Sequence, residues 1–224
     1  MENPWKDFSS EETTPKFHPL DLEHALAFNR LMAANPNYVL ADHLDPYPYT
    51  GNPNANVFVL LANPGVSLIQ KNPQFQISAE FRDRNLKNLR HESSDSFISW
   101  LHSDENPEKS EDWWIPRIRN VVHDSSLERV SRNLFFINFH AYNSVSWYPI
   151  PFTFPTQEYM FQLVRQAISR DALIILARNE LGWCTAIPEL LDYRNLLRFK
   201  SNRSAHVTSN NLGKVEYETL LRHL

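Results

Sequence analysis

The chain has 224 residues, of which 42% are hydrophobic and 12% aromatic, so it can bury a substantial core as one domain. Its 22 basic and 26 acidic residues give a formal net charge of −4, which excludes a general attraction to nucleic acid and leaves only a local patch for such contacts. The single cysteine, Cys184, excludes an internal disulfide and a cysteine-based zinc or iron–sulfur centre.

The sequence pattern predicts neither a membrane span nor a signal peptide. No apolar run reaches the roughly 18–20 residues that cross a bilayer. The start, MENPWKDFSSEETTP, lacks the basic and apolar parts of a signal peptide. The single cysteine is compatible with a reducing compartment. We therefore expect a cytoplasmic protein without membrane contact.

The N-terminal part predicts a polar arm, a helix and a connection before the first strand. Residues 1–16 are mostly polar and predict a loose arm, followed by a single domain over residues 17–224. Apolar residues recur at helical spacing over 21–34, and Asn35-Pro36-Asn37 ends that helix. The Pro- and Asn-rich stretch 45–56 predicts an irregular connection.

The stretch NVFVLLANPGVS, residues 56–67, holds the first strand and the turn that ends it. Residues 57–61 form an unbroken apolar run, too short for a buried helix, which predicts a strand covered on both faces. Pro64 removes a backbone donor and favours an extended Asn63, and Gly65 permits a close approach to the backbone. Such a turn after a buried strand is typical of sites at the carboxyl edge of an open α/β sheet.

The middle of the chain predicts helices joined by polar loops. Helices are expected over 78–89, 93–101 and 113–122, and a capping box of Ser125 and Glu128 predicts a helix that ends near residue 132. The acidic stretch DENPEKSED, residues 104–112, predicts a solvated loop.

Three more short apolar runs predict buried strands, each followed by a helix. The strands are expected at 134–138, 172–177 and 196–199, and the helices at 156–169, 181–191 and 214–224. The alternation of helices with short buried strands predicts an α/β fold, with a three-layer αβα arrangement around a central, mainly parallel, four-stranded sheet.

Polar side chains follow each predicted strand at the point where the strand ends. They are Asn63 after the first strand, Asn138, His140, Tyr142, Asn143 and Ser144 around the end of the second, Arg178 and Asn179 after the third, and Ser201 to Asn211 after the fourth. Because the carboxyl ends of parallel strands share one edge, we expect these groups to converge on one cleft. That cleft is rich in amides, hydroxyls and aromatic rings and poor in carboxylates.

The motifs that are missing from the sequence exclude several kinds of catalytic and binding site. The sequence has no GxxxxGK[ST] or GxGxxG phosphate loop, no HExxH and no GxSxG elbow. Its nine histidines are scattered without metal-ligand spacing, and paired acids at two strand ends are missing. We therefore expect no metal and no cofactor. Planar amides that match a base edge, and aromatic faces that stack on a ring, suit a flat, polar, uncharged heterocycle.

The order of these motifs resembles the uracil-DNA glycosylase superfamily. PYPYTGNPNANVFVLLANPG is similar to the lead-in and first motif of that family, whose mismatch-specific and single-strand-selective branches carry G-x-N-P-G, with Leu61 here in place of the first glycine. LFFINFHAYNS and ALIILARNELGW resemble the second and third strands of the family. SNRSAHVTSNNL stands where the family has its His-Pro-Ser loop, which this sequence lacks. The resemblance runs from about Pro46 to the C-terminus.

The resemblance implies a hydrolase that flips a uracil-like or damaged base out of single- or double-stranded DNA and cleaves its N-glycosidic bond. On this reading Asn63 holds the attacking water, Asn138 reads the base edge, and Phe75 or Tyr142 stacks on the ring. His206 is the candidate catalytic residue in place of the missing histidine. The nucleic-acid contacts are expected from Gly65, Ser67, Ser201, Asn202, Arg203 and Ser204.

Other interpretations stay open. A non-catalytic nucleic-acid or nucleotide-binding module of the same fold accounts for the missing His-Pro-Ser motif. The aromatic loop 139–155 also suits an interface with a protein partner of unknown identity. Tyr142 and Phe75 are aromatic residues, which pack in protein cores as well as stack on bases. The basic run Arg194, Arg198, Lys200 and Arg203 predicts either a phosphate-contacting rim or a solvated edge.

Overall fold

A computed structural model of the chain describes residues 1–9, 15–66, 70, 79–92, 111–201 and 203–224. The predicted helix over 93–101, residues 104–110 of the predicted acidic loop, and the predicted site residues Ser67, Phe75 and Asn202 lie outside the described residues. None of the helices in the described ranges has the length and apolar character that crossing a bilayer requires.

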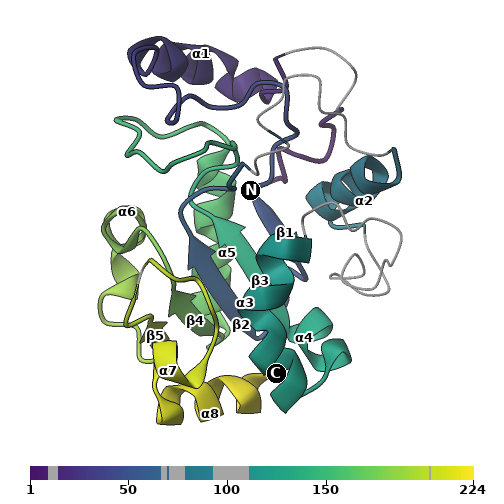
Figure 1. The fold of residues 1–224 in the computed structure, drawn as a ribbon, viewed down its shortest axis with the longest axis vertical. Coiled ribbons are helices and arrows are strands. Elements are labelled where there is room, and N and C mark those ends of the chain that lie inside the picture. Colours follow the sequence, from purple (N-terminus) through teal and green to yellow (C-terminus); the bar gives the residue numbers. More distant parts are fainter. Residues whose placement is uncertain (10–14, 67–69, 71–78, 93–110, 202) are drawn as a thin grey trace. The chain divides into compact units, whose positions relative to one another are not determined.

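A five-stranded sheet, with its strands in the order β1-β3-β2-β4-β5, organises the described chain (Figure 1). The strands are β1 Tyr49–Gly51, β2 Val57–Leu61, β3 Leu134–Asn138, β4 Leu173–Leu176 and β5 Leu196–Arg198. β2, β4 and β5 run parallel, with Val57 opposite Leu173 and Ile174 opposite Leu196. All four predicted apolar runs form strands, and the predicted α/β class is confirmed.

The prediction of four strands is wrong by one, because β1 forms inside the stretch interpreted as a connection. Gly51 at its end has a φ of +112°, and a Cβ there would lie 2.5 Å from the carbonyl oxygen of Leu134. Glycine is therefore required for β1 to end this close to the start of β3. A strand of three residues is too short to show a hydrophobic period, so the sequence pattern does not reveal it.

Helices connect the strands and mostly match the predicted segments. They are η1 Pro19–Asp21, α1 Leu22–Leu31, α2 Ala79–Arg90, α3 Glu111–Asp124, α4 Leu127–Asn133, α5 Gln157–Ser169, α6 Glu180–Ala186, η3 Pro188–Leu190, α7 Ser209–Leu212 and α8 Lys214–His223. The predicted cap at Ser125 is wrong by one residue, since the Ser126 hydroxyl accepts the N–H of Arg129 at 3.2 Å. The helix predicted over 181–191 ends earlier, because Pro188 has no N–H to continue it.

The chain forms two compact units that alternate along the sequence. Unit 1 comprises Met1–Tyr49, Ala62–Glu92 and Asn138–Gln162, and unit 2 comprises Thr50–Leu61, Ser93–Ile137 and Leu163–Leu224. That residues 17–224 act as a single domain stays a prediction.

Residues 1–9 are packed into unit 1. Trp5 is 0% exposed and Phe8 is 5% exposed, and the Trp5 ring lies 5.1 Å from the ring of His18. The side-chain amide of Asn3 donates to the carbonyl of Leu89 at 2.7 Å. The predicted loose arm is therefore wrong for residues 1–9, because burial of two aromatic rings outweighs the polar composition of the segment.

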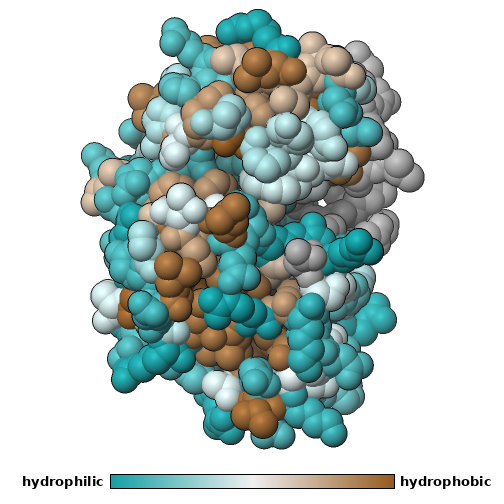
Figure 2. Space-filling view, turned by 90° about the vertical axis from the view of Figure 1, so that its left-hand side faces the viewer, coloured by the Kyte–Doolittle hydropathy of each residue, from teal (hydrophilic) through white to brown (hydrophobic). Residues whose placement is uncertain are grey.

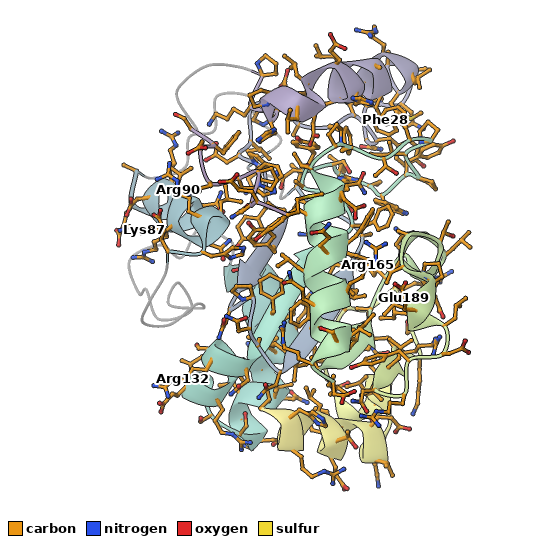
Figure 3. The ribbon with its side chains drawn as sticks, turned by 180° about the vertical axis from the view of Figure 1, so that it is seen from behind. Phe28, Lys87, Arg90, Arg132, Arg165 and Glu189 are labelled. Atoms are coloured by element: carbon orange, nitrogen blue, oxygen red, sulfur yellow. The ribbon has the colours of Figure 1, made fainter. Side chains whose placement is uncertain are left out.

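The sheet forms the core of unit 2, with α3 on one side and α5 on the other (Figures 1 and 3). Every residue of β2 and β4 is buried. On α6, Trp183 is fully buried and its indole N–H donates to the carbonyl of Leu61 at 2.8 Å. Arg165 on α5 points toward Glu189 with its Nε 3.6 Å from the carboxylate, and it also donates to the carbonyl of Ala186 (Figure 3). These contacts join α5, α6 and the end of β2.

Unit 2 also exposes a few large apolar side chains. Leu181, Leu191 and Val215 are 81%, 61% and 69% exposed. Figure 2, which views the side bearing α6 and α7, shows apolar residues between polar ones on this face. Single exposed apolar side chains of this kind are common on protein surfaces.

Candidate functional site

The turn after β2 and the loop after β3 lie side by side in unit 1. Phe139 N donates to the carbonyl of Ala62 at 3.0 Å, and Ser144 N donates to the carbonyl of Pro64 at 3.3 Å. Gly65 and Ser144 form a parallel bridge. The two segments therefore pair with each other past the ends of β2 and β3.

The side chain of Asn63 is oriented by two hydrogen bonds of its amide nitrogen. Its amide nitrogen donates to the hydroxyl of Ser144 at 2.8 Å and to the carbonyl of Pro64 at 3.0 Å. The Ser144 hydroxyl in turn donates to the carbonyl of Ser146 at 2.9 Å, so it must accept from Asn63. The Oδ1 of Asn63 accepts from no residue in the described part of the chain. This half-buried side chain thus presents one oriented acceptor.

Asn138 presents a second oriented acceptor, and it is 3% exposed. Its backbone N–H donates to the carbonyl of Pro48 at 2.8 Å, and its amide nitrogen donates to the carbonyl of Tyr47 at 2.8 Å. A carbonyl accepts only from a donor, so the amide nitrogen faces Tyr47 and Oδ1 faces away from it. That Oδ1 is buried and has no hydrogen-bond partner among the described residues. A buried acceptor in this state costs about 1–3 kcal/mol.

His140 lies two residues after Asn138 and is neutral. Burial lowers its pKa to about 3. Its Nδ1 accepts the N–H of Tyr142 at 3.3 Å, so the ring proton is on Nε2. The ring stacks on Trp147 with centroids 5.2 Å apart. His140 is thus a neutral hydrogen-bond donor and not a general acid at physiological pH.

Tyr142 is a core residue of unit 1. It is 1% exposed, and its ring packs edge-on against Phe17 and Phe154 at 5.1 Å each. Its hydroxyl donates to Asp21 at 2.6 Å, and burial together with that carboxylate raises its pKa well above the usual value. The ring has no free face for the base stacking that the sequence predicts. The buried carboxylate of Asp21, which also accepts two bonds from Thr156, was not recognised from the sequence.

Unit 2 contains the loop that follows β5. Asn211 on α7 holds this loop, because its Oδ1 accepts the N–H of Ser201 at 3.0 Å and its amide nitrogen donates to the carbonyls of Ser204 and His206 at 2.9 and 3.1 Å. Ser201 and Arg203 are exposed, and His206 is half-buried. The sequence placed Asn211 at the end of the polar stretch after the fourth strand but did not predict its bonds to the loop, although the Thr208 cap three residues earlier marks the turn that positions it.

The predicted site residues are divided between the two units. Unit 1 contains Asn63, Gly65, Asn138 and Tyr142, and unit 2 contains Ser201, Arg203, Ser204 and His206. Their convergence on one cleft stays a prediction. In the described residues, no three His, Cys, Asp or Glu side chains are grouped so as to hold a metal ion.

Comparison of this chain with models of protein families, with curated proteins and with solved structures finds no match. The resemblance to uracil-DNA glycosylases therefore rests on the motif residues alone.

Proposed function

We propose that this protein binds a nucleobase at the amides of Asn63 and Asn138 and hydrolyses its N-glycosidic bond, in the manner of a uracil-DNA glycosylase. The observation that supports this most is the oriented Oδ1 of Asn138, which has no hydrogen-bond partner in the described part of the chain. An N–H on the edge of a uracil-like base is the donor that this acceptor lacks. The proposal includes the finer fold assignment, a three-layer αβα arrangement of the glycosylase type.

Asn63 suits the role of a water-positioning residue in this reaction. Two hydrogen bonds from its nitrogen orient the side chain and leave Oδ1 to accept from water. Water attacks C1′ of the sugar, the bond from C1′ to the base nitrogen breaks, and the base leaves with the electron pair. Since Asn63 takes no proton, the proton of the water passes to the departing base or to solvent. Catalysis then depends on electrostatic stabilisation of the oxocarbenium-like state.

A non-catalytic binding module is the second candidate. The side chains after β2 and β3 in unit 1 favour it, because they are neutral at physiological pH. The pKa of His140 is about 3, and the amides of Asn63 and Asn138 do not titrate. A base can bind there by hydrogen bonds without any proton transfer. The assignment of His206 as the substitute for the missing histidine stays a prediction.

Release of uracil from single- and double-stranded oligonucleotides tests the two candidates. We expect base release by the wild type, and a loss of about tenfold or more in Asn63→Ala and in Asn138→Ala, because each variant removes one hydrogen bond to the reacting groups. Asn120→Ala is the matched control, since Asn120 is an exposed amide on α3. Equal release by the wild type and both site variants would discard these assignments.

Binding without release would select the second candidate. In that case oligonucleotide affinity depends on salt, and alkali treatment reveals no abasic sites. A protein that neither releases a base nor binds any nucleic acid would contradict both.

A further inference from the structure

Two tyrosine rings lie together at the surface of unit 1. Tyr148 is 42% exposed and Tyr38 is half-buried, and their ring centroids are 4.9 Å apart with an angle of 43° between the ring planes. A single exposed ring is common on a protein surface. These two rings come from distant segments of the chain, so the fold has to bring them together.

Backbone hydrogen bonds join the two segments that carry the rings. Ser146 N donates to the carbonyl of Asn37 at 2.9 Å, and Ala41 N donates to the carbonyl of Asn143 at 2.8 Å. These two bonds lie on either side of Tyr38 along the chain. The segment that carries this ring is therefore fixed at both ends to the loop after β3.

The neighbours of Tyr148 in the chain restrict its motion. The ring of Trp147, immediately before it, stacks on the ring of His140 with centroids 5.2 Å apart. Pro149, immediately after it, limits the backbone conformations that Tyr148 can adopt. A ring that is held in this way is preorganised, so a ligand that stacks on it loses little conformational entropy.

The loop that carries Tyr148 is also bonded to Asn63. The amide nitrogen of Asn63 donates to the hydroxyl of Ser144 at 2.8 Å, and that hydroxyl donates to the carbonyl of Ser146 at 2.9 Å. Ser146 is two residues before Tyr148 in the chain. The two rings and the oriented acceptor of Asn63 therefore lie on neighbouring parts of unit 1.

The segments that carry the two rings are uncharged. Residues 31–41 and 143–157 contain no Asp, Glu, Lys or Arg. These segments therefore offer no ion pair to a phosphate group, and the group that suits their aromatic rings is a planar, uncharged one. Nucleic-acid bases stack on aromatic side chains whatever their sequence, because every base has a π-face.

We propose that Tyr38 and Tyr148 form a stacking platform for an unpaired base of a single-stranded nucleic acid whose strand reaches Asn63. The inference rests on the proposed function, which puts a nucleotide at Asn63, and it adds the form of nucleic acid that the protein selects. In a duplex the neighbouring bases cover both faces of each base, whereas an unpaired base can turn out onto the rings. The protein therefore binds single strands in preference to duplexes.

Fluorescence anisotropy on the full chain tests the proposal with three labelled probes of equal length. These are a single strand of deoxythymidine, the same strand paired in a duplex, and a strand of spacers that lack bases but keep the phosphodiester links. We expect the thymidine strand to bind at least about fivefold more tightly than the other two probes, because stacking of one base contributes this much. Equal affinity for the thymidine strand and either of the other probes would overturn the proposal.

Variants assign the stacking to the two rings. We expect Tyr148→Ala and Tyr38→Ala each to weaken binding of the thymidine strand at least about fivefold and to leave binding of the spacer strand unchanged. Tyr148→Phe keeps the ring and therefore the affinity. Leu191→Ala, at an exposed apolar position of unit 2, is the matched control and leaves binding unchanged. Circular dichroism and thermal unfolding confirm that each variant is folded.

Uracil release by the same variants separates this proposal from the proposed function. If Asn63→Ala loses the release activity of the wild type while Tyr148→Ala binds the thymidine strand as the wild type does, base release stands and the stacking platform is wrong. If no uracil is released but Tyr148→Ala weakens strand binding, the platform stands on a non-catalytic binding module. Loss of self-association in Tyr148→Ala, with unchanged strand affinity, would assign the rings to an interface between copies of the chain and overturn the proposal.

Discussion

At the scale of single residues, burial decides which polar groups hold the structure and which remain open to a ligand. Asp21 is 0% exposed and its acceptors are used by Tyr142 and Thr156. Asn138 is nearly as buried, but no residue that the structure describes donates to its Oδ1. Sequence composition does not distinguish these two situations, because both residues are polar and lie next to apolar segments.

Replacement of Asp21 by alanine is expected to destabilise the protein by about 3 kcal/mol, because three buried donors lose their acceptor. Chemical denaturation followed by circular dichroism measures this change. Asp192→Ala is the control, since Asp192 is exposed and its loss costs no more than about 0.5 kcal/mol. A loss at Asp21 no larger than in the control would mean that this hydrogen-bond network does not support unit 1.

Stability is expected to fall as the pH is lowered from about 6.5 toward 4, because His140 stays neutral in the folded protein. Its folded pKa is about 3, while the unfolded histidine takes up a proton near its usual value of 6.5. The unfolded state therefore binds more protons in this range, and acid favours it. His91, whose pKa burial lowers to about 4, acts in the same direction.

Denaturant titrations at a series of pH values measure this dependence. The variant His140→Gln keeps an acceptor for the N–H of Tyr142 and removes the titrating ring, so its stability falls less steeply with acid. Asn120→Gln, an exchange of one amide for another at an exposed position, keeps the slope of the wild type. An unchanged slope in the His140 variant would show that this ring is already accessible to protons.

At the scale of secondary-structure elements, short segments are held by side-chain bonds to the backbone. The loop after β5 has three such bonds from Asn211, and β1 ends at a glycine that no other residue replaces without strain. Neither feature follows from hydrophobic periodicity. Each depends on which backbone the fold brings near.

Asn211→Ala is expected to loosen the loop over 201–206 and to cost about 2–3 kcal/mol, since one N–H and two carbonyls lose their partner. Hydrogen exchange of the Ser201 amide, measured with the free energy of unfolding, reports this change. The neighbouring exposed residue in Asn210→Ala provides the control. Slow exchange at Ser201 in both variants would contradict this function of Asn211.

Gly51→Ala is expected to destabilise unit 2 by at least about 2 kcal/mol, because it adds a Cβ at positive φ and 2.5 Å from the carbonyl of Leu134. Gly65→Ala is the comparison, since nothing lies within 4 Å of a Cβ there and its φ is not positive. Thermal unfolding of the two variants measures the difference. Equal melting temperatures would mean that β1 does not pair closely with β3.

At the scale of the whole molecule, the charge balance limits any contact with nucleic acid. The formal net charge is −4, so only a few local cations can contact phosphates. We expect the logarithm of single-strand affinity to fall with the logarithm of salt concentration with a slope of about −1.4 to −2.1, which corresponds to two or three phosphate contacts. Fluorescence anisotropy over a salt series measures the slope. A steep slope, as many phosphate contacts give, would require a basic surface that this composition does not supply.

Much of the fold could be predicted from the sequence, because unbroken apolar runs and helical spacing reflect burial directly. Residues 57–61, 134–138 and 172–177 were recognised as strands since each must be covered on both faces. β1 was missed because it is short, and the packing of Trp5 was missed because one ring in a polar segment leaves no periodic pattern.

The candidate site was predictable only in part. The sequence predicted that Asn63 and Asn138 stand at the ends of their strands. The bridge between Gly65 and Ser144 agrees with the predicted sheet edge. The hydrogen-bond partners of the Asn63 and Asn138 side-chain amides could not be predicted. Tyr142 was predicted to stack on a base because it is aromatic, but its ring packs against Phe17 and Phe154 in the core.

The sequence by itself determined the α/β class, the buried strands and the polar residues at their ends, because these follow from local patterns of hydrophobicity and turn formers. The tertiary structure alone decided which polar atoms remain without a partner. It pairs Arg198 with Glu180, and it orients Asn138 by a carbonyl 91 residues away. Hydrogen bonds and charge pairs between distant residues exist only once the chain has folded, so no local pattern contains them.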